Sequence, residues 1–238
     1  MILKKNAFPP ALLLVLLASV APAQTAAPYP TLIPASRQSD PVCAAKHARY
    51  VEETKGNPDL IFLGDSITEL WSGNGKDAWA KHYGSMKAAQ FGVSADRVQN
   101  VLWRVKNGEI DQPKVVVLLV GTNNIWDNPG TQIAAGISAI IQEIQQRSPQ
   151  TKFLLLGVFP RGEKPGTSER DNVARMNAEI AKLDDRKTVF YLDIGGKFLE
   201  PDGTLSKDMM GDFLHPTAKG YEIWAEAIQD QLDSLMKS

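Results

Sequence analysis

The chain has 238 residues, of which 43% are hydrophobic, and this is enough to bury one full core as a single domain. Its 26 basic and 27 acidic residues leave a net charge of -1, so there is no basic surface for a nucleic acid and no polybasic patch for an anionic membrane. The charge balance favours a neutral or weakly charged small substrate.

The N-terminus has the three parts of a signal peptide, and residues 1–23 are assigned to it. Lys4 and Lys5 precede an apolar run at residues 11–20, and Ala-Pro-Ala at 21–23 supplies the small residues that signal peptidase inspects. The run is about half the length needed to cross a bilayer. We therefore expect cleavage after Ala23, a secreted or periplasmic protein, and no stable membrane insertion.

Residues 24–57 are expected to form an N-terminal arm or linker. Residues 24–40 are rich in Pro, Ala, Ser and Thr, a composition typical of extended segments. Cys43 is the only cysteine of the chain, which excludes an intramolecular disulfide and leaves the role of this thiol open.

Residues 58–238 are predicted to form one domain in which strands and helices alternate. Five apolar runs without polar alternation indicate strands that are covered on both faces, at 59–63, 86–91, 114–120, 152–157 and 188–192. Helical patterns lie between or after them, at 97–106, 131–147, 168–183 and 218–236. Strands separated by helices of this length predict a three-layer α/β/α sandwich around a five-stranded parallel sheet.

Ligands of such sheets bind outside the carboxyl ends of the strands. Three short polar or glycine-containing turns are expected at that rim, at 64–66, 91–96 and 121–124. These turns are the candidate positions for a functional site before any chemistry is considered.

A serine hydroxyl becomes a nucleophile when a neighbouring base takes its proton, and the chain has three histidines. His47 lies near the expected linker and His82 in a polar helical stretch, and for both a solvated or capping role is favoured. His215 differs because Asp212 stands three residues before it, a spacing that brings a carboxylate to the imidazole Nδ1–H. The same spacing occurs in metal sites, so the pair alone is ambiguous.

Ser66 and Asn123 are ambiguous in the same way. A serine at a strand-to-helix junction is usually an N-cap, but a serine at a helix start also points its own N–H and the helix dipole at a bound anion. Asn123 either forms an Asx turn or donates its amide to an oxyanion, beside backbone N–H groups of Ser66 and of the second-strand loop. Their joint order on one rim is more specific than either residue alone.

Five sequence blocks in a fixed order resemble the SGNH (GDSL-type) hydrolases, in particular the subgroup containing the α subunits of intracellular platelet-activating factor acetylhydrolase. The blocks are FLGDSITE at 62–69, FG at 91–92 with DRVQNVLWR at 96–104, VGTNN at 120–124, LGVFPRG at 156–162 and DFLH at 212–215. Together they cover about residues 58–235, which is essentially the whole domain.

The resemblance implies a flavodoxin-like sandwich that hydrolyses esters through an acyl-serine, with no metal and no organic cofactor. It makes Ser66 the nucleophile, His215 the general base and acid, and Asp212 the residue that orients His215. It also implies an oxyanion hole built from the N–H of Ser66, the N–H of Ala95 and the side chain of Asn123.

Ala95 departs from the family pattern, which usually has glycine immediately before the aspartate of the second block. Alanine keeps the backbone donor, and Gly92 is an alternative donor. If this position has a positive φ, we expect Ala95 to carry strain of about 1 kcal/mol and to narrow the acyl pocket.

The substrate is predicted to be a short-chain ester, because the resembling enzymes act on acetyl esters. Export suggests an extracytoplasmic small-molecule or carbohydrate ester. Asp65, Trp126 and Arg161 are candidate substrate contacts, and Trp71 is a further candidate, with ordinary packing as the alternative for the tryptophans. The paired α subunits of the resembling enzyme suggest a homodimer.

Three other functions remain to be distinguished. One is a lysophospholipase or thioesterase-type acyl hydrolase, which only a substrate panel separates from an acetylesterase. Another is a non-catalytic carbohydrate-binding protein on the same fold, against which the intact Ser66, Asp212, His215 and Asn123 argue. The third is a flavodoxin-like cofactor binder, but the first loop lacks a run of phosphate-cradling residues.

Overall fold

The computed structural model describes residues 27–237, so the expected signal peptide lies outside the described residues. Five parallel strands form one sheet with the order β2-β1-β3-β4-β5, which confirms the predicted sheet. The strands are β1 Leu60–Gly64, β2 Ala88–Gly92, β3 Val115–Leu119, β4 Lys152–Leu156 and β5 Val189–Leu192. Most begin one or two residues later than the apolar runs predict.

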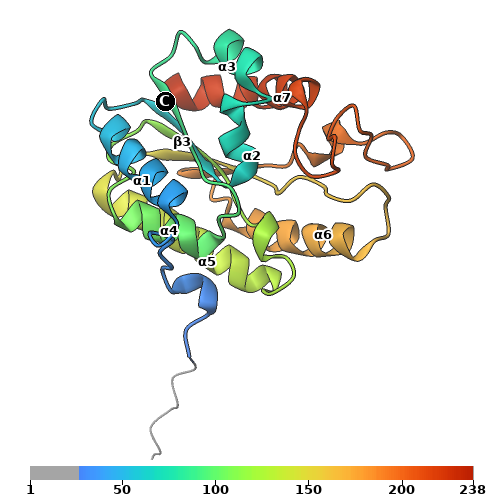
Figure 1. The fold of residues 1–238 in the computed structure, drawn as a ribbon, viewed down its shortest axis with the longest axis horizontal. Helices are drawn as coiled ribbons and strands as arrows, with labels where there is room; N and C mark the ends of the chain where they lie inside the picture. The colour runs from blue at the N-terminus through green and yellow to red at the C-terminus, as the bar shows by residue number, and fades with distance from the viewer. Residues whose placement is uncertain (1–26, 238) are drawn as a thin grey trace, which may run out of the picture.

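Helices cover both faces of the sheet and complete the α/β/α sandwich (Figure 1). One layer contains α1 Pro41–Thr54, α4 Val98–Lys106, α5 Gly130–Arg147 and α6 Ser168–Ile180, of which α4 packs on α5 and α5 on α6. The other layer contains α2 Ser66–Glu69, α3 Lys76–His82 and α7 Ala218–Lys237, with α3 packed on α7. Short 3-10 helices lie in the connections, at η1 Pro30–Leu32, η2 Leu70–Ser72, η3 Thr122–Asn124, η4 Ala181–Leu183 and η5 Gly195–Phe198.

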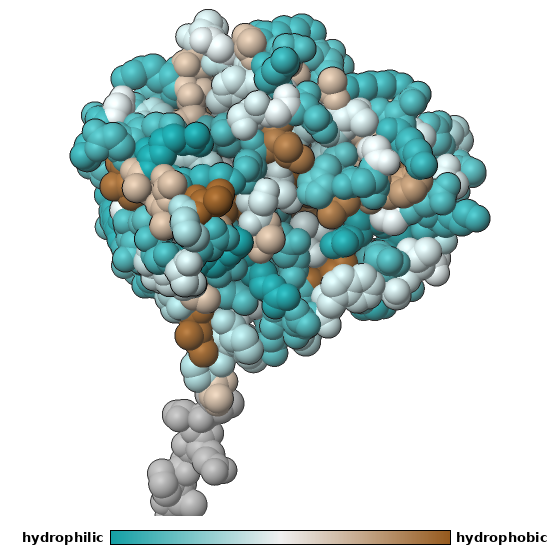
Figure 2. Space-filling view, in the orientation of Figure 1, coloured by the Kyte–Doolittle hydropathy of each residue, from teal (hydrophilic) through white to brown (hydrophobic). Residues whose placement is uncertain are grey.

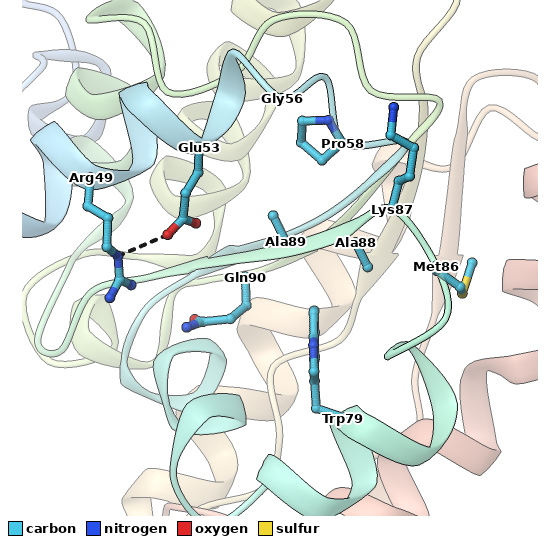
Figure 3. A pocket seen from close by; sticks show the side chains of 10 residues that line it. All are labelled: Arg49, Glu53, Gly56, Pro58, Trp79, Met86, Lys87, Ala88, Ala89 and Gln90. Carbon is cyan, nitrogen blue, oxygen red and sulfur yellow. Dashed lines mark ion pairs between the residues drawn. The ribbon is translucent and has the colours of Figure 1, made fainter.

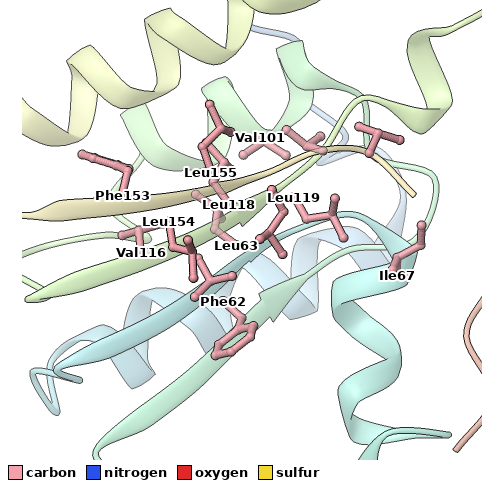
Figure 4. Close-up of a cluster of buried hydrophobic side chains, with 14 of the residues drawn as sticks. Phe62, Leu63, Ile67, Val101, Val116, Leu118, Leu119, Phe153, Leu154 and Leu155 are labelled. Atoms are coloured by element: carbon pink, nitrogen blue, oxygen red, sulfur yellow. The ribbon is translucent and has the colours of Figure 1, made fainter. Parts of the chain in front are cut away.

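The core has a different character on the two faces of the sheet. Aliphatic side chains of β1, β3 and β4 lie against α4 and its neighbours on one face (Figure 4). On the other face, Trp71 is only 1% exposed, and its ring centroid lies 4.6 Å from that of Tyr221 and 4.8 Å from that of Trp224. Trp71 is therefore a core residue, and of the two roles considered from the sequence, packing applies and substrate contact does not, because the aromatic cluster buries the side chain.

Helix α1 lies inside the segment 24–57 that the sequence indicates as an arm. Tyr50 of α1 is fully buried and stacks on Phe91 of β2 with ring centroids 4.7 Å apart. Cys43 is also buried on this helix, and burial raises the pKa of its thiol. This part of the segment therefore packs onto the domain, because a few large side chains on one face anchor an otherwise polar helix.

The strand order places the three candidate turns together. The chain runs from β1 out to β2 at the edge of the sheet and then returns to β3 on the other side of β1. The register aligns Gly64 with both Gly92 and Leu119, so the three strands end level with one another. Open parallel sheets bind ligands where the connections diverge in this way.

The surface in the view of Figure 2 is mainly hydrophilic, with apolar atoms in small separate patches. Within residues 27–237, no helix is both long enough and apolar enough to cross a membrane. The exposed large apolar side chains of this part of the chain are Tyr29, Leu32, Ile33, Val42 and Trp126.

Candidate active site

Ser66 is the first residue of α2, directly after the turn that ends β1. Asp65 caps this helix, because its Oδ1 accepts a hydrogen bond of 3.0 Å from the N–H of Ile67. The turn requires Gly64, since a Cβ there would lie 2.1 Å from the carbonyl oxygen of Leu119. The packing fixes the backbone of Ser66 and leaves its side chain at the carboxyl rim of the sheet.

The loop before α7 brings His215 to Ser66 across 149 residues of sequence. His215 Nε2 lies 2.9 Å from Ser66 Oγ, and His215 Nδ1 lies 2.7 Å from Asp212 Oδ2. The second oxygen of Asp212 accepts the backbone N–H groups of Leu214, at 3.1 Å, and of His215, at 2.8 Å. Serine, imidazole and carboxylate therefore form one continuous hydrogen-bonded chain.

Asp212 remains ionised in this arrangement. Burial raises the pKa of its carboxyl group, but the hydrogen bonds from the N–H and the imidazole of His215 outweigh that effect and hold the pKa below its usual value. An ionised carboxylate accepts the Nδ1–H of the imidazole, which leaves the lone pair of Nε2 directed at Ser66.

The backbone N–H groups of Ser66 and of Ala95, in the loop after β2, have no hydrogen-bond partner within residues 27–237. The neighbouring donors of the loop are occupied, because Ser94 N–H donates to Glu69 Oε2 at 2.6 Å and Asp96 N–H to the carbonyl of Val93 at 3.1 Å. Ala95 has φ +62°, so the left-handed conformation considered from the sequence is present.

The side chain of Asn123, on η3, contacts the loop that carries Ala95. Its Nδ2 donates a hydrogen bond of 2.9 Å to the carbonyl of Asp96, which fixes the amide and leaves its second N–H available. Gly92, the alternative donor, lies against α2, since a Cβ on it would lie 2.0 Å from the backbone nitrogen of Glu69. Its backbone is therefore packed against α2, and the geometry favours Ala95 over Gly92 as the loop donor.

Residues 62–223 match the model of the GDSL-like lipase/acylhydrolase family. The chain is a member of this family. It is 38% identical to subunit alpha2 of platelet-activating factor acetylhydrolase IB from Rattus norvegicus over 204 residues, which are 84% of this chain and 87% of that protein. Its identity to subunit alpha1 of the human enzyme is 34% over 202 residues, covering 84% of this chain and 86% of that one.

Solved structures share the fold of this GDSL-like acylhydrolase. A GDSL-like lipase from Bacteroides thetaiotaomicron superposes with a TM-score of 0.65 and 21% identity, covering 80% of this chain and 98% of that chain. An acetyl xylan esterase superposes with a TM-score of 0.60 and 22% identity, covering 73% and 98%. At these identities the superpositions establish the three-layer architecture.

Asp65 directly precedes Ser66 and is buried at the start of α2. The residue is 1% exposed, which leaves no surface for the substrate contact expected from the sequence. Burial raises the pKa of its carboxyl group to about 7. Asp65 therefore shapes the turn that presents Ser66.

Arg104 forms a buried charge network behind the catalytic loops, which the sequence did not indicate. Its guanidinium donates to Asp96 Oδ2 at 2.8 Å, to the carbonyl of Gly64 at 2.9 Å and to Glu109. These contacts join the ends of β1 and β2 to α4. Burial raises the pKa of Asp96, and Arg104 opposes that shift.

The remaining candidate contacts have different surroundings. Trp126 is 55% exposed on the segment after η3. Arg161 donates to the carbonyl of Thr122 at 3.1 Å and so ties the loop after β4 to the loop after β3. His47 and His82 pair with carboxylates, His47 with Glu109 and His82 with Glu222, and neither takes part in the chain of hydrogen bonds at Ser66.

A separate pocket of about 500 Å³ lies along the edge strand β2, between α1 and α3 (Figure 3). It is lined by the Arg49–Glu53 ion pair, Trp79 and residues 86–90, and it shares no residue with the site around Ser66.

Within the described part of the chain, no group of three or more His, Cys, Asp or Glu side chains is arranged to hold a metal ion.

Proposed function

We propose that this GDSL-like acylhydrolase is a serine esterase that cleaves short-chain carboxylic esters, acetyl esters above all, through an acyl-enzyme on Ser66. The observation that carries the proposal is the continuous chain from Asp212 through His215 to Ser66 Oγ, with distances of 2.7 and 2.9 Å. Such a chain is what makes a serine hydroxyl nucleophilic at neutral pH.

The proposed reaction begins when Ser66 Oγ attacks the ester carbonyl carbon and His215 Nε2 takes its proton. The carbonyl oxygen becomes an oxyanion that accepts hydrogen bonds from the N–H groups of Ser66 and Ala95 and from the amide of Asn123. His215 then donates its proton to the departing alcohol as the carbon–oxygen bond breaks, and Asp212 stabilises the imidazolium in between. Water attacks the acyl-serine in the same way and releases the acid.

The preference for acetyl esters draws on the names of similar proteins. The curated relatives are platelet-activating factor acetylhydrolase subunits, and one structural neighbour is an acetyl xylan esterase. Both names specify hydrolysis that releases an acetyl group. Together with the signal-peptide pattern, they favour an extracytoplasmic acetylated compound, with an O-acetylated carbohydrate as the leading candidate.

Export and pairing of two copies are part of the same proposal. Expression of the full chain in a bacterium, followed by N-terminal sequencing of the periplasmic or secreted protein, is expected to give Gln24 as the first residue. Retention of Met1 in the cytoplasm would contradict export. A homodimer predicts twice the mass of the chain by light scattering, and a concentration-independent monomer mass would contradict it.

The deciding experiment measures hydrolysis of p-nitrophenyl acetate and p-nitrophenyl octanoate by the wild type and by Ser66→Ala. Ser234→Ala is the matched control, because Ser234 is exposed on α7. We expect acetate to be hydrolysed faster than octanoate, Ser66→Ala to lose both activities, and Ser234→Ala to keep them. A preference for octanoate would overturn the acetyl specificity and favour a lysophospholipase type. Absence of Ser66-dependent turnover of either ester would overturn the esterase.

A further inference from the structure

The loop that carries Ala95 accepts hydrogen bonds from a side chain that is distant from it in the sequence. Arg37 Nη1 donates a hydrogen bond of 2.6 Å to the carbonyl of Ser94 and one of 3.0 Å to Asp96 Oδ1. Arg37 precedes α1, and it also precedes residues 62–223, the part of the chain that matches the family model. The contact is therefore a feature of this chain's N-terminal segment.

The carbonyl of Ser94 and the N–H of Ala95 are the two ends of one peptide unit. Because that unit is planar and trans, the direction of the carbonyl fixes the direction of the N–H, which points the opposite way. A donor held on the Ser94 oxygen therefore also sets where the Ala95 N–H points. Hydrogen bonding at the oxygen further polarises the unit and strengthens its N–H as a donor.

The two neighbouring peptide units of the loop are held by other hydrogen bonds. In the Val93–Ser94 unit, Ser94 N–H donates to Glu69 of α2, and in the Ala95–Asp96 unit, Asp96 N–H donates to the carbonyl of Val93. Within residues 27–237, the Ser94–Ala95 unit between them is held by Arg37 alone. Since Ala95 has φ +62°, a strained value for alanine, this unit needs an external restraint to keep its orientation.

Arg37 is itself anchored to the domain. The N–H of Ala35 donates to the carbonyl of Gln99 at 3.0 Å, and Asn100 Nδ2 donates to the carbonyl of Ala35 at 2.9 Å. Arg37 Nη2 also lies 3.6 Å from Oδ2 of Asp40, the residue that caps α1. The N-terminal segment thus joins α4 on one side and α1 on the other, and Arg37 bridges from it to the oxyanion loop.

We propose that Arg37 is a positioning residue of the oxyanion hole, which holds the Ser94–Ala95 peptide so that the Ala95 N–H points at the developing oxyanion. The proposal rests on the proposed esterase function. Among the described residues, the side chain of Arg37 bonds to Ser94, Asp96 and Asp40 and to none of Ser66, Asp212 and His215, so we expect its loss to lower kcat more than it raises KM.

The test compares Arg37→Met, Arg37→Lys and the control Arg49→Met, in which a surface ion pair with Glu53 is lost. For p-nitrophenyl acetate we expect Arg37→Met to lower kcat about tenfold with KM changed less than about threefold, since a misdirected donor weakens the transition state selectively. Arg37→Lys is expected to restore most of kcat, and Arg49→Met to match the wild type. Thermal unfolding establishes that all variants are folded.

Inhibition by a boronic acid that bonds to Ser66 gives a second measurement, which depends on the oxyanion hole itself. The boronate oxygen occupies the oxyanion position, so the inhibition constant is expected to rise by the same factor as kcat falls. Wild-type kcat and boronate affinity in Arg37→Met would overturn the assignment, as would a change confined to KM. If Arg37→Met fails to unfold cooperatively, Arg37→Gln replaces it with the same criteria. An inactive wild type would overturn the esterase and the Arg37 assignment together.

Discussion

Replacement of Asp65 by asparagine is expected to change how stability depends on pH. Asp65 is 1% exposed, its Oδ1 accepts a hydrogen bond from the N–H of Ile67, and the nearby charge of Arg104 opposes the effect of burial on its pKa only in part. Asparagine has the same shape, and its Oδ1 can accept the same hydrogen bond, so the substitution removes the ionisation and keeps the helix cap.

The size of the effect follows from the pKa of Asp65, which burial raises from 3.8 to about 7. Between those two values the folded chain keeps a proton that the unfolded chain has released, so the stability of the wild type falls as pH rises through this window. The full difference is about 4 kcal/mol once pH exceeds the folded-state pKa. Asparagine does not titrate, so the variant lacks this loss.

Urea unfolding followed by tryptophan fluorescence measures the free energy of unfolding of both proteins between about pH 4 and pH 8. We expect the two proteins to have similar free energies of unfolding near pH 4. As the pH rises, the free energy of unfolding of Asp65→Asn is expected to exceed that of the wild type by an increasing amount, up to about 4 kcal/mol at pH 8. Asp230→Asn is the control, because it makes the same substitution at an aspartate that is exposed on α7.

Parallel pH profiles for Asp65→Asn and the wild type would contradict a raised pKa of Asp65 in the folded protein. They would mean that the buried carboxylate is ionised in the folded protein at mildly acidic pH. The cause would then be compensation of the charge by the start of α2, and burial would no longer decide the protonation state.

Three further predictions concern the catalytic loops. Asn123→Ala is expected to lower kcat about 10²–10³-fold with little change in KM, since one oxyanion donor is lost; a loss confined to KM in steady-state kinetics would contradict this. Asp212→Asn is expected to fold normally and lower kcat about 10⁴-fold, because the amide no longer fixes the productive tautomer of His215, and near-wild-type turnover would exclude that role. Ala95→Gly is expected to raise the free energy of unfolding by up to about 1 kcal/mol through relief of the positive φ; a lower urea midpoint would show that the alanine is unstrained.

The sequence predicts the sheet well because its strands are buried on both faces and therefore appear as uninterrupted apolar runs. Helix α1 is harder to predict, since only Cys43, Tyr50 and Thr54 of its 14 residues are buried. Its composition is otherwise that of a solvated segment, and the stacking of Tyr50 on Phe91 depends on a contact that is distant in the sequence.

The candidate site is predictable in part, for a similar physical reason. The order of Ser66, Asn123, Asp212 and His215 along the chain points to one rim, and the structure brings their side chains there. The supporting groups leave weaker patterns, because Asp65, Glu69 and Arg104 are charged residues that composition assigns to the surface. The burial of Asp65 and Arg104 and the partial burial of Glu69 depend on packing between segments that are distant in the sequence. Arg37 shows the same limit, because a cation in a Pro- and Ser-rich segment resembles part of a solvated linker.

Covalent labelling tests whether Ser66 is the nucleophile and His215 its base. The wild type, Ser66→Ala and His215→Ala are each treated with a fluorophosphonate ester, and the modified peptide is identified by mass spectrometry. We expect a single adduct on the peptide containing Ser66, no adduct in Ser66→Ala, and strongly slowed labelling in His215→Ala. An adduct on another residue, or labelling of Ser66 at an unchanged rate without His215, would contradict the proposed nucleophile and base.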